Sequence, residues 1–260
     1  PSGTVIPPQD CVVLGKSILE PKGKTGFGLS LLGESIYLFS GDSRGDLTGW
    51  CQGFDFGAQE QGSSFGRWIT SDRRAHLVPY AQPSLGTVNP EPIAGPVIFS
   101  EIMFHPPLAD GVTPWRDQFI ELTDTTRNLE SFPLYDPADP SRTWGIRGDI
   151  EFDFPPGFRF PDNRRVILAG FDPSWNTEAL AGFRARYRLD KTVTILGPWR
   201  GTLNAGRGFV RLLKPLGSSD DPTVGALVEE VNYLSHAPWP DGAAGTGFSI
   251  VRHVPSAFAA

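Results

Sequence analysis

Short runs of apolar residues recur along the chain, separated by segments rich in glycine and proline. Six of these runs have the length and the β-branched or aromatic content of strands, at residues 11–14, 35–39, 97–103, 118–122, 165–168 and 209–213. One segment has helical spacing instead, at Ala179, Leu180, Phe183 and Tyr187. Asp172 can cap this helix and Pro173 fits its first turn. The pattern predicts a mostly β protein with one short helix.

The pattern of the first part of the chain repeats in the second part. Residues 3–14 match residues 157–168 without a gap. Shorter matches follow in the same order, pairing residues 29–30 with 203–204, 36–39 with 210–213, 54–56 with 231–233 and 62–67 with 247–252. The strands predicted between residues 97 and 154 have no counterpart before residue 3.

The repeat predicts the domain organisation. We expect one complete β domain at residues 97–260 and the C-terminal part of a preceding copy at residues 1–78. A linker with five prolines joins them at residues 79–96. A β domain without its opening strands exposes a sheet edge and an apolar face. We therefore expect a partner that completes the first copy, either an upstream part of the same polypeptide, which is favoured, or another chain by strand addition.

Several segments carry a family resemblance. Residues 97–107, Val-Ile-Phe-Ser-Glu-Ile-Met-Phe-His-Pro-Pro, followed by residues 117–122, Asp-Gln-Phe-Ile-Glu-Leu, resemble the opening of a bacterial lamin-tail domain. Residues 152–157, 196–199 and 237–240 fit its later strands and turns. Residues 54–57 and 64–67 resemble tandem copies of this domain in large secreted bacterial proteins. The chain departs from the family pattern at residues 123–124 and 134–135. The resemblance implies an immunoglobulin-like β-sandwich in an extracellular, cell-surface or periplasmic bacterial protein.

Composition narrows the function classes. The 30 glycines and 25 prolines among 260 residues disfavour a helical bundle or a doubly wound α/β fold. The net charge of −6 without a clustered basic face argues against nucleic-acid binding, and no apolar run is long enough for a membrane span. Cys11 and Cys51 are too few for a disulfide scaffold or a zinc site, and whether they pair is open. The four histidines stand singly, so we expect neither a metal nor a cofactor.

Two groups of residues could carry catalysis. Ser43 stands in a Gly-x-Ser-x-Gly segment after an apolar run, as in a serine hydrolase, but turn residues follow it where a nucleophile elbow needs a helix. A hairpin turn is the favoured interpretation. Glu101 and Glu121 lie inside strands and could act as acid and base, or bind a metal with His105 and Asp117. Their alternation with apolar residues favours a structural role.

Tryptophans give the best indication of binding. Several lie beside proline or glycine in predicted loops, and as exposed aromatic side chains they could bind a sugar or a protein: Trp115, Trp144, Trp199 and Trp239, with Trp175 as a further member. The alternative, that they close the ends of the sandwich, is favoured. The sequence predicts a non-enzymatic structural or adhesive module that acts through protein contacts. The alternatives are a carbohydrate- or surface-binding accessory module of an enzyme and a serine hydrolase using Ser43.

Overall fold

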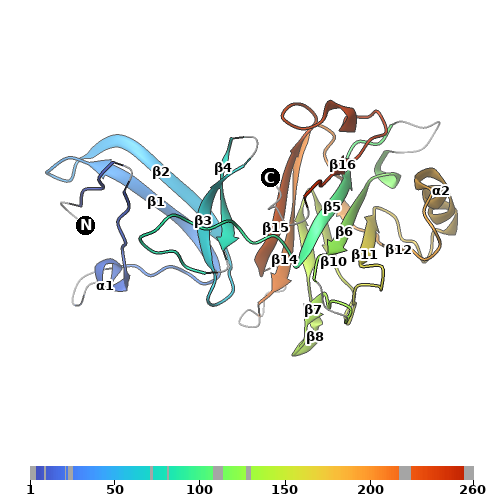
Figure 1. The fold of residues 1–260 in the computed structure, drawn as a ribbon, viewed down its shortest axis with the longest axis horizontal. Coiled ribbons are helices and arrows are strands. Elements are labelled where there is room, and N and C mark those ends of the chain that lie inside the picture. The colour runs from blue at the N-terminus through green and yellow to red at the C-terminus, as the bar shows by residue number, and fades with distance from the viewer. Residues whose placement is uncertain are drawn as a thin grey trace. The chain divides into compact units, whose positions relative to one another are not determined.

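The protein is mostly β, with 41% of residues in strands and 9% in helices. The computed structural model describes residues 4–8, 10–20, 22, 26–70, 73–80, 82–107, 114–126, 130–216 and 224–254 (Figure 1). The chain divides into two compact units. Unit 1 comprises Pro1–Trp68 and Ala75–Pro92, and unit 2 comprises Ile69–Arg74 and Ile93–Ala260. The predicted mostly β class is confirmed.

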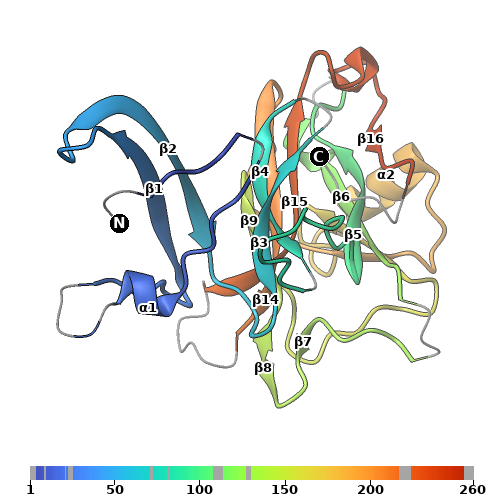
Figure 2. The same ribbon diagram turned by 60° about the vertical axis from the view of Figure 1, so that its left-hand side comes forward.

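Unit 1 contains a short helix and two separate two-stranded sheets. The elements are α1 (Lys16–Leu19), β1 (Gly33–Gly41), β2 (Leu47–Gly57), β3 (Ser64–Ile69) and β4 (Ala75–Tyr80). The long β1–β2 hairpin is antiparallel, and β3 pairs with β4 (Figure 2). The strand predicted at residues 35–39 is confirmed within β1. Few side chains of this unit are buried, among them Val78 and Tyr80 of β4, each 2% exposed.

The strand predicted at residues 11–14 is wrong. This segment is irregular and exposed, and it is followed by α1, which the sequence pattern did not indicate. Apolar side chains alone do not make a strand, because the backbone needs a neighbouring strand to accept and donate its hydrogen bonds. Its counterpart in the repeat, residues 165–168, has such neighbours on both sides in unit 2.

The predicted linker also begins too early. Pro79 and Tyr80 belong to β4, and Tyr80 packs against β3. A Cβ atom at Gly66 would lie 2.2 Å from Cε2 of the Tyr80 ring, so the close approach requires glycine at this position. The irregular segment begins only after Tyr80, and the division between the two units falls after Pro92.

Unit 2 is built from two five-stranded sheets and a helix. One sheet has the order β13-β10-β9-β14-β15 and the other the order β12-β11-β6-β5-β16. The elements in chain order are β5 (Val97–Met103), η1 (Pro114–Arg116), β6 (Phe119–Asp124), β7 (Tyr135–Asp136), β8 (Asp139–Thr143), β9 (Gly145–Gly148), β10 (Ile150–Asp153), β11 (Arg165–Ala169), α2 (Thr177–Tyr187), β12 (Thr194–Leu196), β13 (Arg200–Gly201), β14 (Arg207–Pro215), β15 (Gly225–Leu234), η2 (Asp241–Ala243) and β16 (Ile250–Val251). The strands predicted from residue 97 onward are confirmed.

The two sheets of unit 2 enclose one hydrophobic core. Alternate residues of both sheets point into it and are almost fully buried, for example Phe99 and Leu122 from one sheet and Val210 and Val231 from the other. Alternation places the intervening side chains outside, so from Arg207 to Leu212 only every second residue of β14 is buried. This arrangement is compatible with a β-sandwich, and the sheets do not close into a barrel.

The predicted helix covers the outer face of β6, β11 and β12. Phe183 of α2 is 3% exposed and lies 6.0 Å from the Phe119 ring in an edge-to-face contact. The helix begins later than predicted. Its N-cap is Asn176, whose side chain accepts a hydrogen bond from the Ala179 N–H at 2.9 Å. Asp172 instead accepts hydrogen bonds from Ser174 in the preceding turn.

A buried carboxylate joins the two sheets where β15 lies beside β5. Ser100 is an extra residue in the β5–β6 ladder, and Val228 is an extra residue in the β14–β15 ladder, so each strand has a bulge there. Glu229 of β15 is fully buried and accepts the Phe99 N–H of the β5 bulge at 2.5 Å. Arg252 forms an ion pair with Glu229, and its backbone N–H donates to the Ser100 carbonyl at 3.0 Å.

We expect Glu229 to make the stability of unit 2 depend on pH. Burial raises the pKa of this carboxyl from 4.5 to about 7, although Arg252 acts in the opposite direction. The folded state therefore binds the proton more tightly than the unfolded chain does. The free energy of unfolding should fall as pH rises from about 4.5 to 7, by about 3 kcal/mol from this group.

The measurement is urea unfolding of the wild type and of Glu229→Gln at several pH values. Gln retains an acceptor for the Phe99 N–H but does not titrate, so the stability of the variant relative to the wild type should rise over this pH range. Glu178→Gln, which replaces an exposed acid on α2, is the control and should follow the wild type. Parallel curves for the wild type and Glu229→Gln would contradict the expectation.

Candidate functional site

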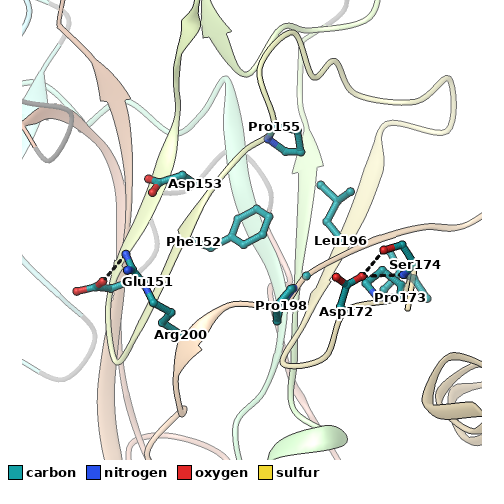
Figure 3. Close-up of a pocket in the computed structure, with 12 residues that line it drawn as sticks. Glu151, Phe152, Asp153, Pro155, Asp172, Pro173, Ser174, Leu196, Pro198 and Arg200 are labelled. Carbon is teal, nitrogen blue, oxygen red and sulfur yellow. Dashed lines mark hydrogen bonds and ion pairs between the residues drawn. The ribbon is translucent and has the colours of Figure 1, made fainter. Parts of the chain in front are cut away.

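An open pocket of about 700 Å³ lies in unit 2 between β10 of one sheet and β12 of the other (Figure 3). Its lining combines apolar and charged side chains from three parts of the chain: Glu151, Phe152, Asp153, Pro155, Asp172, Pro173, Ser174, Ile195, Leu196, Gly197, Pro198 and Arg200. Phe152 and Ile195 are each 8% exposed and belong to the packed interior, whereas the charged residues are more accessible. The pocket is an apolar hollow with a charged rim.

Each of the three carboxylates on this rim already has a partner. Arg200 forms an ion pair with Glu151 at 3.1 Å, and Arg147 does so with Asp153 at 2.5 Å. The Ser174 hydroxyl and N–H donate to Asp172 at 2.6 and 2.8 Å. These hydrogen bonds lower the pKa of Asp172. Because the acids serve the local structure, the pocket is not arranged as an acid–base pair.

The predicted binding tryptophans do not form one surface. Trp144 and Trp199 are 2% and 6% exposed and belong to the core of unit 2, so their expected exposure is wrong. Trp239 is partly buried against the same core. Trp115 is 37% exposed, with the Arg116 guanidinium 5.2 Å from its ring centroid. Trp175, at 87%, is the most exposed of the five. Flanking glycine and proline thus indicated loops and strand ends, but not exposure.

The burial of Trp144 predicts a structural role that can be measured. Its ring makes an edge-to-face contact with Phe132 at 5.6 Å inside the core. Replacing it with alanine leaves a cavity, and we expect Trp144→Ala to lower the free energy of unfolding by about 3 to 5 kcal/mol. Trp175→Ala should change it by less than about 0.5 kcal/mol. Chemical unfolding of both variants checks this, and equal losses would contradict it.

Ser43 lies in the turn of the β1–β2 hairpin. Asp42 organises this turn, because its carboxylate accepts the N–H groups of Arg44 and Asp46 at 2.8 and 3.0 Å. Gly45 has a φ of +91°, which a turn residue without a side chain adopts readily. β2 begins at Leu47, so a strand and not a helix follows the serine. The predicted hairpin turn is confirmed.

The turn geometry predicts that Ser43 is an ordinary hydroxyl. A nucleophilic serine needs an adjacent base and an oxyanion hole, and the turn hydrogen bonds described above supply neither. We expect a fluorophosphonate probe to label the wild type no more than it labels Ser43→Ala, read by intact mass. Labelling that disappears specifically in Ser43→Ala would restore the hydrolase interpretation.

Glu101 and Glu121 are opposite each other in the β5–β6 ladder. The Ser249 hydroxyl donates to Glu101, and the Ser100 hydroxyl donates to Glu121 at 2.7 Å. Burial raises the pKa of Glu101, and the neighbouring Glu121 charge adds to this effect. The hydroxyl contacts support the structural interpretation favoured from the sequence.

The other two members of the possible metal set are His105, whose ring lies 6.5 Å from that of Phe104, and Asp117. Asp117 forms an ion pair with Arg186 of α2 at 2.8 Å, and burial raises its pKa. Among the residues that the structure describes, no three His, Cys, Asp or Glu side chains are grouped so that they could hold a metal ion. Cys11 and Cys51 are both exposed and unpaired with each other.

A further candidate surface is the β1–β2 hairpin. The sequence predicted an exposed apolar face in the first copy but did not assign it to these strands. Residues opposite each other share a face and successive residues alternate, so the strand register defines two faces. We call the face with Glu34, Ile36, Leu38, Gln52, Phe54 and Phe56 hairpin face 1, and the face with Ser35, Tyr37, Phe39, Cys51, Gly53 and Asp55 hairpin face 2.

Both hairpin faces expose large apolar side chains. Ile36 and Leu38 of hairpin face 1 are 38% and 49% exposed, and Tyr37 and Phe39 of hairpin face 2 are 57% and 52% exposed. Trp50, which precedes Cys51 in β2, is 51% exposed. The signal was present in the sequence, because four consecutive apolar residues in one strand are typical of a strand that is covered on both faces.

The comparisons with known proteins leave the family open. No protein-family model matches the chain, and neither the curated proteins nor the solved structures yielded a match. In the part of the chain that the structure describes, no helix is both long and apolar enough to cross a membrane.

Proposed function

We propose that this chain is a non-catalytic structural or assembly module of a secreted or surface-attached bacterial protein, and that it acts through protein–protein contacts. The observation that carries the proposal is the β1–β2 hairpin, whose two faces both expose large apolar side chains. A two-stranded hairpin is at best marginally stable in water by itself. Contiguous exposed apolar surface of this kind marks a site of interaction.

The fold we propose for unit 2 is an immunoglobulin-like sandwich of the lamin-tail type. Its support is the sequence resemblance of residues 97–107 and 117–122, together with two five-stranded sheets around one core. In this proposal unit 1 is a second, incomplete copy in tandem. The secreted or surface location follows from the same resemblance.

The two alternative functions have less support. A carbohydrate-binding module would use exposed aromatic rings, and Trp144 and Trp199 are in the core. A hydrolase would use Ser43, which lies in a hairpin turn followed by a strand. The described side chains therefore favour assembly through protein–protein contacts of the β1–β2 hairpin.

An unpartnered hairpin surface predicts association of the isolated protein. We expect sedimentation velocity to show reversible self-association between about 10 and 100 μM, because no partner covers the apolar faces. Changing both faces together, in Leu38→Asp/Phe39→Asp, should leave a monomer. Thermal unfolding of unit 2 should be unchanged, since both side chains are exposed in unit 1.

The matched control is Val88→Asp/Trp175→Asp. It introduces the same two charges at exposed apolar residues outside the hairpin, 93% and 87% exposed, and it should associate like the wild type. A wild type that stays monomeric over this range, or a control that dissociates as fully as the hairpin variant, would contradict the proposal.

A further inference from the structure

The β1–β2 hairpin of unit 1 has the strand register of the β14–β15 hairpin of unit 2. The sequence repeat aligns residues 36–39 with 210–213 and residues 54–56 with 231–233. Three successive cross-strand pairs coincide under this alignment: Glu34↔Phe56 with Gly208↔Tyr233, Ile36↔Phe54 with Val210↔Val231, and Leu38↔Gln52 with Leu212↔Glu229. The sequence alignment did not use these pairings, so the agreement is independent of it. Hairpin face 1 corresponds to the buried face of β14–β15.

In unit 2 the β15 side of this face contacts β5 and the residue that follows it. The Phe104 ring lies 4.7 Å from the Tyr233 ring, and the Phe99 N–H donates to Glu229 at 2.5 Å. Val210 and Leu212 of β14 belong to the core between the two sheets and are 0% exposed. The corresponding Ile36 and Leu38 of unit 1 have no such cover and are 38% and 49% exposed.

A second part of unit 1 lacks the neighbour of its counterpart. Residues 11–14 align with residues 165–168 of β11, which pairs with β6 in an antiparallel ladder. Residues 11–14 form no strand, and Val12 and Val13 are 38% and 46% exposed. In unit 2, β6 is the hairpin partner of β5. A single β5–β6 hairpin would therefore supply both missing neighbours.

We propose, building on the assembly function above, that hairpin face 1 receives a partner β-hairpin of the β5–β6 type. Its first strand would pack an aromatic side chain on Phe56 and place a bulge N–H against the Gln52 side-chain oxygen. These are the positions that Tyr233 and Glu229 occupy in unit 2. Its second strand would give residues 11–14 a ladder partner.

A second copy of this chain is a poor donor of that hairpin. In unit 2, β5 pairs with β6 and β16, and β6 also pairs with β11. Releasing these strands would open the core of the donor. The occupant we propose is therefore a separate partner protein that presents two antiparallel apolar strands as a hairpin.

The test uses the whole chain and a synthetic, fluorescein-labelled peptide of residues 97–124, which spans β5 and β6. With the chain at about 1 μM and upwards, fluorescence anisotropy should show saturable binding, and the peptide should sediment with the monomer. The same peptide composition in scrambled order is the peptide control and should not bind.

Neighbouring residues on opposite faces provide the matched variants. Leu38 and Phe39 are about equally exposed, at 49% and 52%, and threonine keeps strand propensity at either position. Leu38→Thr on hairpin face 1 should weaken peptide binding about tenfold, and Phe39→Thr on hairpin face 2 less than about threefold. Gln52→Ala should weaken it about tenfold, because the bulge N–H loses its acceptor.

The outcomes separate this proposal from the assembly function. No peptide binding at about 100 μM, equal losses for Leu38→Thr and Phe39→Thr, or peptide found only with dimers would each overturn the proposed occupant. A chain that self-associates through the hairpin but ignores the peptide would leave the assembly function standing. A chain that does neither would contradict both.

Discussion

Covering the apolar face of a sheet is the constraint on which the rest of this structure depends. In unit 2, the inward side chains of β14 and β15 are buried because β5 and its neighbours supply a second sheet. This burial is the main source of stability for such a unit, at about 25 cal/mol for each Å² of apolar surface removed from water. Within its sheet, β14 has ladder neighbours on both sides, β9 and β15, whereas β15 is the edge strand.

Specific hydrogen bonds of buried polar side chains, as well as apolar packing, hold the two sheets of unit 2 together. Gln118 is 3% exposed, and its amide group donates to the Phe104 and Leu203 carbonyls at 2.7 Å. Glu229 joins the bulges of β5 and β15. Buried polar groups of this kind are costly unless they are paired, so they favour one arrangement of the two sheets over others. These contacts therefore fix how the two sheets pack around the core between them.

The sequence was informative wherever a local pattern and its tertiary neighbours agree. Residues 97–103 were predicted to the residue as β5, because their apolar run is covered on both sides in the fold. Residues 11–14 are also apolar but form no strand, whereas residues 165–168, with which they align, have β6 and β12 as ladder neighbours. The side-chain pattern of a segment shows whether it can form a strand. Whether it does so also depends on a neighbouring strand, which the local pattern does not include.

The candidate site was harder to predict for a related reason. Exposure of Trp144 or Trp199 depends on what the remainder of the chain places over them, and glycine and proline neighbours are equally common at buried strand ends. The sequence predicted residues 35–39 as a strand and an exposed apolar face somewhere in the first copy, but a local pattern does not show which strand stays uncovered. The same residues are covered or uncovered according to whether a second sheet is present.

If hairpin face 1 is completed by docking, as proposed above, the difference between Gln52 and Glu229 follows from when each face is covered. Glu229 is buried once, as unit 2 folds, and Arg252 of the same unit compensates its charge. A face that is exposed first and covered later must lose its water at the moment of docking, and removing a carboxylate from water costs several kcal/mol more than removing a neutral amide. Glutamine keeps the acceptor that a bulge N–H needs and avoids that cost. The neutral side chain at residue 52 is thus the choice expected for a surface that is completed by docking and not by folding.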